Sequence, residues 1–175
     1  EEVTFDKEDT REGLRLSGLA LTGVAATALN PTITPTLIEQ SLEGAVADGI
    51  VMAGTVDLVD DQNRIIDLKT SKRKWPETKA AYELQPPLYS VLFQAVTGHP
   101  PGGFEYAVVA DGKTPSVQRI EATPTPQQTQ AALLRVQSAI QGIAAGSFPY
   151  RPSPMTCGFC GYNALCPVGS AYLKN

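Results

Sequence analysis

The stretch GTVDLVDDQNRIIDLK, residues 54–69, decides the fold of this chain. Two runs rich in β-branched residues flank the polar turn at residues 60–63, and this pattern predicts a β-hairpin. Similar runs lie before and after it. The sequence therefore predicts an antiparallel meander extended by two further strands, over residues 34–44, 49–59, 64–70, 104–110 and 116–122.

The hairpin carries two acids and a lysine. Alternation predicts that Asp57 shares a face with Val59, and that Asp67 shares a face with Lys69. Aspartate is a poor strand former, so its presence inside apolar runs points to another role. Convergent carboxylates suit Mg²⁺ or Mn²⁺, and a lysine beside such a metal suits phosphodiester hydrolysis. The alternative is a solvated edge hairpin with a gatekeeper lysine.

Composition sets the limits. The 175 residues fit one domain, and no apolar run or leader predicts a membrane span or a signal peptide. The net charge of −4 excludes a protein coated in basic residues. Three adjacent cations, Lys72, Arg73 and Lys74, still form a local patch that suits phosphate contacts. A solvated lysine-rich loop is the other interpretation.

Three helices are expected, over residues 10–29, 77–96 and 126–145. Pro86-Pro87 predicts that the second helix kinks or restarts there. Gln85 and Tyr89 are four residues apart and therefore share a helical face. Beside the acids they suit contacts to a phosphate or a base edge, and without the acids Tyr89 is an ordinary core residue.

The tail holds all 3 cysteines of the chain, Cys157, Cys160 and Cys166. The first two have the spacing of metal ligands, and glycines beside them free the backbone to wrap an ion. A thiolate site for zinc or an iron–sulfur cluster needs a fourth ligand, which the sequence nearby lacks. A disulfide and a reduced trio are the alternatives.

Four motifs follow one another along the chain: Gly54-x-x-Asp57, Asp67-x-Lys69 with Thr70-Ser71, Gln85-x-x-x-Tyr89, and the cysteine tail. Over Leu37 to Pro167 the chain resembles the RecB-like branch of the PD-(D/E)XK nuclease superfamily. Within that branch it resembles in particular the CRISPR-associated exonucleases numbered four and the AddB-type iron–sulfur nucleases.

The resemblance implies residue roles. Asp57, Asp67 and the main-chain carbonyl of Leu68 would bind Mg²⁺ or Mn²⁺, and Lys69 would position the attacking water. Gln85 and Tyr89 would help to hold DNA. Cys157, Cys160 and Cys166 would supply three ligands of a [4Fe-4S] cluster.

The chain departs from the family at several points. Val56 replaces the family's proline. The family's first cluster cysteine and a metal-binding histidine normally lie upstream of these motifs. Because the chain opens Glu-Glu without a methionine, we expect them in a preceding segment.

The fold class expected from the resemblance is mixed α/β: a restriction-endonuclease-like mixed sheet flanked by helices, with a cysteine-rich tail. We expect one nuclease domain over residues 1–175, made of a helical part (1–33), a core (34–148) and the tail (149–175).

The expected function is a cytoplasmic, metal-dependent DNA exonuclease for single strands or DNA ends, in recombination, repair or CRISPR adaptation. DNA and the complexes of those pathways are its expected partners, and a membrane is not. The alternatives are a catalytically idle DNA-binding or scaffold module, and a zinc knuckle in the tail that binds nucleic acid.

Overall fold

The structure is a computed structural model that describes residues 10–169 and residue 171. Parts of the predicted N-terminal segment and tail, residues 1–9, 170 and 172–175, lie outside this description. The chain divides into two compact units, up to Leu134 and from Arg135 onward. The helix α4 (Pro126–Ala144) crosses the boundary. The single domain expected over residues 1–175 stays a prediction.

The first unit is built on a five-stranded sheet of order β1-β2-β3-β4-β5. Adjacent strands are antiparallel except for β3 and β4, which are parallel. The predicted meander and mixed sheet are confirmed, and strand bounds agree with those expected to within a few residues. The strands are β1 (Pro35–Ala47), β2 (Ile50–Asp60), β3 (Arg64–Ser71), β4 (Gly103–Ala110) and β5 (Ser116–Glu121).

The turn between β2 and β3 is held by Asp60, whose side chain is buried with 1% exposure. Its Oδ1 accepts the main-chain N–H groups of Gln62 at 3.0 Å and Arg64 at 2.9 Å. Asn63 takes a left-handed φ of 58°, which asparagine tolerates. Gly102 packs so tightly on this turn that a Cβ there would lie 2.0 Å from the carbonyl oxygen of Gln62. The turn is therefore fixed by contacts from the chain before β4 as well as by its own sequence.

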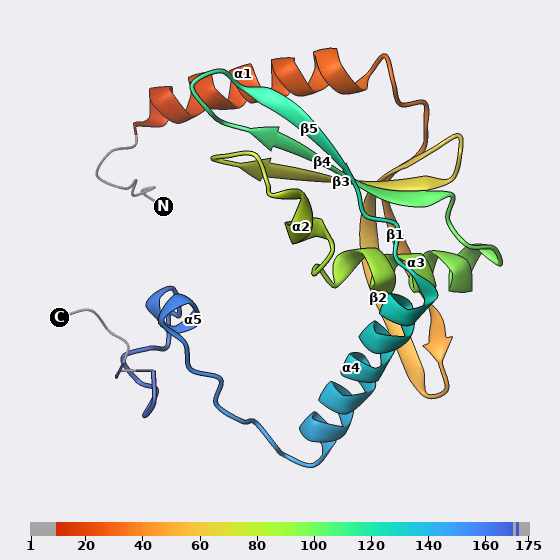
Figure 1. Cartoon of the computed structure of the whole chain (residues 1–175), viewed down its shortest axis with the longest axis vertical. Helices are drawn as coiled ribbons and strands as arrows, with labels where there is room; N and C mark the ends of the chain where they lie inside the picture. The colour runs from red at the N-terminus through yellow and green to blue at the C-terminus, as the bar shows by residue number, and fades with distance from the viewer. Residues whose placement is uncertain (1–9, 170, 172–175) are drawn as a thin grey trace. The chain divides into compact units, whose positions relative to one another are not determined.

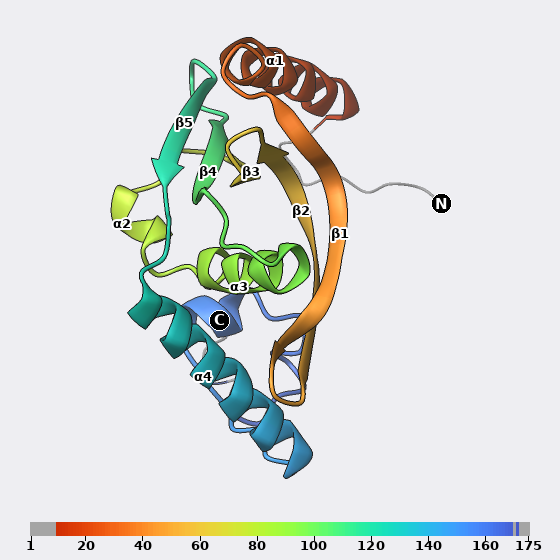
Figure 2. The same cartoon turned by 90° about the vertical axis from the view of Figure 1, so that its right-hand side faces the viewer.

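Helices cover both faces of the sheet. Helix α1 (Arg11–Leu29) and helix α3 (Gln85–Thr97) lie on opposite sides of it (Figures 1 and 2). The larger core faces α3 and the smaller core faces α1. The larger includes Val56, Val59, Ile65, Leu92, Phe93, Phe104 and Tyr106, and the smaller consists of Leu29, Ile33, Ile66 and Ala107.

The predicted break in the second helix is confirmed. A short helix α2 (Glu77–Ala80) ends before α3 restarts with prolines in its first turn, where their missing N–H groups cost no helical bond. The first and last predicted helices correspond to α1 and α4. Among residues 10–169, no helix has the length and apolar character needed to cross a membrane.

The second unit contains the C-terminal part of α4 and a one-turn helix, α5 (Pro154–Gly158). Ser153 caps α5 by accepting the N–H of Thr156 at 3.0 Å. This helix was not predicted from the sequence, because a single turn is too short to show an apolar period.

Candidate active site

Asp57 lies where the hairpin ladder opens. Strands β2 and β3 pair at Leu58–Ile66 and Val59–Ile65. Beyond these pairs the two main chains are joined through a side chain, since Oδ2 of Asp57 on β2 accepts the main-chain N–H of Leu68 on β3 at 2.7 Å. A side-chain carboxylate thus takes the place of a main-chain acceptor, which brings Asp57 against the strand that carries Asp67.

The predicted alternation of β2 is wrong in one respect. Val56 and Val59 both belong to the core that faces α3, although they are three positions apart and should face opposite sides. The strand must therefore rotate between them, in the segment that contains Asp57. The predicted shared face of Asp67 and Lys69 is in contrast confirmed by their ion pair.

Asp67 is buried, with 6% of its surface exposed. Its Oδ1 accepts the side-chain amide of Gln85 at 3.2 Å, and its Oδ2 lies 2.6 Å from Nζ of Lys69. Burial raises the pKa of Asp67 above its ordinary value, and the charges of Asp57 and Glu83 act in the same direction. The Lys69 ammonium opposes these effects through its hydrogen bond and its charge.

Gln85 and Tyr89 present one face of α3 to the hairpin, as their spacing predicted. The hydroxyl of Tyr89 donates to the main-chain carbonyl of Thr55 at 2.9 Å. A Cβ at Gly54 would lie 3.1 Å from Cε1 of Tyr89. Glycine at this position therefore allows α3 to lie close enough to β2 for Gln85 to reach Asp67.

The residues fit a divalent cation in one specific way. Oδ2 of Asp67 is buried, and the Lys69 ammonium lies 2.6 Å from it. An ionised carboxylate has about four acceptor sites, and Gln85 and Lys69 occupy two of them, so Asp67 can still bind a cation. In residues 10–169 no three His, Cys, Asp or Glu side chains gather as a metal site. Within the described residues, the main-chain carbonyl of Leu68 is therefore the further ligand that the resemblance implies.

Two residues near Asp67 were missed by the sequence analysis. Tyr106 pairs with Asp67 across the parallel β3–β4 ladder, and its hydroxyl is buried without a partner among the described residues. Burial raises the pKa of Tyr106, and the charge of Asp67 raises it further. Glu83 adds negative charge at the same place and binds Lys79 at 2.8 Å. No sequence signal could identify Tyr106, because it depends on the strand pairing.

The predicted basic patch is exposed. Lys72, Arg73 and Lys74 follow β3 directly, and in the described part of the chain none of them forms an ion pair. Lys79 differs from them, since its Nζ lies 3.4 Å from the centroid of the Trp75 ring. The three adjacent cations are thus free to contact an anion.

The three cysteines belong to the second unit, and all three are free thiols. Cys157 is buried, Cys160 is exposed, and Sγ of Cys166 accepts the N–H of Gly169 at 3.2 Å. These thiols are the right kind of donor for an iron–sulfur cluster. Within the described residues, however, they are neither gathered nor joined by a fourth ligand. The cluster stays a prediction.

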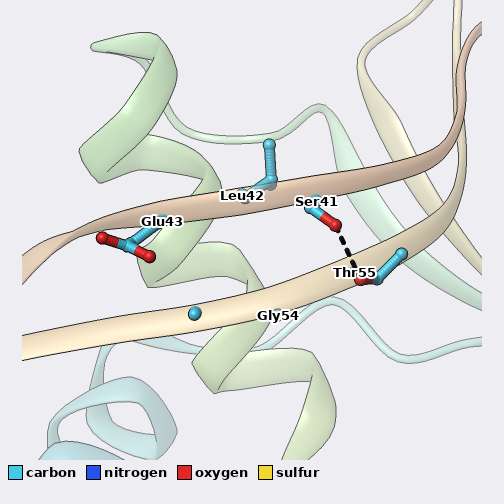
Figure 3. A pocket seen from close by; sticks show the side chains of 6 residues that line it. Ser41, Leu42, Glu43, Gly54 and Thr55 are labelled. Carbon is cyan, nitrogen blue, oxygen red and sulfur yellow. Dashed lines mark hydrogen bonds between the residues drawn. The ribbon is translucent and has the colours of Figure 1, made fainter.

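A shallow hollow lies over the β1–β2 pair (Figure 3). Its volume is about 350 Å³, and it is lined by Ser41, Leu42, Glu43, Ala53, Gly54 and Thr55. The hydroxyls of Ser41 and Thr55 lie 3.1 Å apart and hydrogen-bond across the two strands. The polar side chains of this hollow are therefore partly satisfied by each other.

Comparison with known proteins identifies the family and the fold. The pattern that describes the PD-(D/E)XK nuclease superfamily matches residues 6–167. A crystal structure from Eubacterium rectale, provisionally described as an exonuclease, superposes with a TM-score of 0.64 at 16% identity. The alignment covers 99% of this chain and 66% of that one, which shows a shared fold.

A second solved structure, SSO0001, gives a TM-score of 0.48 at 18% identity, over 93% of this chain and 70% of the other. A search of curated proteins gave no match. The family match spans the hairpin, α3 and the cysteine tail. The chain belongs to the PD-(D/E)XK nuclease superfamily.

Proposed function

We propose that this chain is a Mg²⁺- or Mn²⁺-dependent deoxyribonuclease that hydrolyses phosphodiester bonds of single strands or DNA ends. One observation carries the proposal: the buried carboxylate of Asp67 is fixed by the Gln85 amide at Oδ1 and by the Lys69 ammonium at Oδ2, so that an acid and a lysine meet at one point. Asp57 on β2 supplies a second carboxylate, and its Oδ2 accepts the main-chain N–H of Leu68, the residue after Asp67 on β3. The main-chain carbonyl of Leu68 is the proposed third ligand.

The side chains have separate roles in this mechanism. A bound divalent cation would supply Lewis-acid chemistry at the phosphate. Lys69 orients the attacking water and offsets negative charge on the phosphate oxygens. Gln85 fixes the rotamer of Asp67, and Tyr89 fixes α3 against β2. Lys72, Arg73 and Lys74 attract the DNA backbone.

The test is cleavage of end-labelled single-stranded and duplex DNA in Mg²⁺, in Mn²⁺ and in EDTA. Lys69→Ala should abolish most cleavage, while Lys113→Ala, at an exposed lysine between β4 and β5, serves as a matched control and should retain it. Equal cleavage by both variants would reject the role of Lys69. Products released one nucleotide at a time would identify an exonuclease, as expected for recombination, repair or CRISPR adaptation.

An idle DNA-binding module is the second candidate. It is favoured by the lack of a third acidic or histidine ligand near Asp67 in residues 10–169. Titration of Mn²⁺ separates the two functions. Absence of saturable Mn²⁺ binding, with DNA affinity unchanged by EDTA, would support the module.

We also propose that Cys157, Cys160 and Cys166 hold a [4Fe-4S] cluster with a fourth ligand from outside the described residues. The proposal is supported by the donor chemistry of three free thiols, whose spacing along the chain resembles that of the family. Anaerobically prepared protein should then show iron, sulfide and a brown colour. A colourless protein that contains zinc would reject the cluster.

A further inference from the structure

A second hollow, which we call the apolar groove, lies between β2 and the start of α3. Its volume is about 210 Å³, and its walls are formed mainly by Met52, Gly54, Leu84 and Leu88. Gln85 and Tyr89 line the same groove. The groove is therefore an apolar site whose polar groups are those of the candidate active site.

We propose that the apolar groove binds one unpaired nucleobase of the strand that is cleaved. The inference rests on the proposed nuclease function and adds a base-binding subsite to it. Such a subsite would restrict cleavage to DNA whose bases can leave the stack.

Continuity with the active site supports this occupant. Gln85 both lines the groove and donates to Oδ1 of Asp67 at 3.2 Å. Tyr89 lines it as well and binds the carbonyl of Thr55, two residues before Asp57. A phosphate at the two acids therefore lies next to the groove, within reach of the base on an adjacent nucleotide.

One wall of the groove belongs to a strand with an unpaired edge. Strand β2 pairs with β3 only at Leu58 and Val59, so in the described structure residues 50–57 have no strand partner on that side. A base in a duplex is stacked and paired, and it cannot lie in an apolar groove without leaving the helix. A base in a single strand can do so, and apolar or aromatic walls then replace the lost stacking.

The chemistry of the walls separates this groove from the hollow in Figure 3. That hollow presents the Ser41 and Thr55 hydroxyls and the Glu43 carboxylate. The negative charge of the carboxylate would repel a phosphate. The two hollows share Ala53 and Gly54. A base therefore fits the apolar groove better, with its amide-bearing Gln85 as the specific polar contact.

The test scans a single abasic nucleotide through a short DNA strand and measures the rate of cleavage at each bond in Mn²⁺. One abasic position relative to the cleaved bond should slow that cleavage about tenfold or more, in keeping with the loss of one base contact. Abasic positions further away should have no effect. Equal rates for every abasic position would overturn the proposal.

A protein variant makes the test specific to the groove. Leu88→Gln should slow cleavage of the intact strand to the rate of the abasic strand, and should change the abasic rate little. Val51→Gln is the matched control, since Val51 lies on β2, is 68% exposed and does not line the groove. If Leu88→Gln slowed both strands equally, the groove would not be the base site.

Binding distinguishes failure of the subsite from failure of the proposed function. In EDTA, a strand carrying 2-aminopurine should change fluorescence on binding to the 175-residue chain, and Leu88→Gln should remove the change. Metal-dependent cleavage without any abasic effect would overturn the subsite and leave the nuclease intact. Lack of cleavage would reject the nuclease, and the fluorescence experiment would still decide whether the groove binds a base.

Discussion

The substitution Asp60→Asn tests the physical account of the hairpin. Asp60 is almost completely buried, and its Oδ2 accepts Nε of Arg64 at 2.8 Å and pairs with Nη2 at 2.7 Å. Asparagine can keep the two main-chain hydrogen bonds of Oδ1, but its amide then faces the guanidinium as donor against donor. Loss of a buried, hydrogen-bonded ion pair costs ~3–5 kcal/mol. The side chain of Arg64 is 30% exposed, and solvent weakens the pair. We therefore expect Asp60→Asn to lower the free energy of unfolding by about 2–4 kcal/mol.

The contribution of Asp60 to the free energy of unfolding depends on pH, because only the ionised carboxylate pairs with Arg64. Burial opposes ionisation of Asp60, but hydrogen bonds from the N–H and guanidinium of Arg64 and from Gln62 outweigh it and lower the pKa below 3.8. Stability from the ionised Asp60 is therefore fully present above pH 3.8 and is lost as the pH falls through the lowered pKa. Wild-type and variant should differ at pH 7 and converge in strong acid.

Urea unfolding followed by circular dichroism measures both quantities. The neighbouring Asp61→Asn is the control, because Asp61 is exposed, and it should change the free energy of unfolding by less than ~0.5 kcal/mol. The reasoning is refuted if Asp60→Asn costs no more than this control at neutral pH. It is equally refuted if the difference is as large at pH 3 as at pH 7.

Three further predictions concern α3, the turn and the basic patch. Gln85→Leu removes the amide donor of Asp67 and should weaken Mn²⁺ binding by calorimetry about tenfold, while the exposed Gln94→Leu should not. Gly102→Ala forces a Cβ onto the Gln62 carbonyl and should lower thermal stability far more than Gly112→Ala, where the nearest atom is 3.7 Å away. Replacing the Lys72–Lys74 segment by three glutamines should weaken DNA binding and reduce its salt dependence, and an unchanged slope would exclude phosphate contacts there.

The hairpin was predictable from the sequence because its information is local. Polar turn residues lie between two β-branched runs, and the acids and Lys69 stand out against strand propensity. The restart of α3 was predictable for the same reason, since Pro86-Pro87 determines it wherever the helix packs.

The surroundings of Asp67 could not be predicted in this way. Tyr106 lies beside Asp67 because β3 and β4 pair in parallel, with partner residues 39 positions apart in the sequence. No local pattern encodes that pairing. The burial of both Val56 and Val59 likewise depends on the rotation of β2 at Asp57. Glu83 contributes charge because it lies two residues before Gln85, whose amide donates to Asp67.

Binding of Mn²⁺ to wild-type protein and to Asp67→Asn, measured by calorimetry together with DNA cleavage, shows whether Asp67 is the centre of a metal-dependent nuclease site. Wild-type protein should bind Mn²⁺ saturably and cleave DNA only when the metal is present. Asp67→Asn should remain folded, lose about a hundredfold or more in Mn²⁺ affinity, and lose cleavage with it. Equal Mn²⁺ affinity and equal cleavage by the two proteins would contradict the assignment of Asp67 as the centre of a nuclease site.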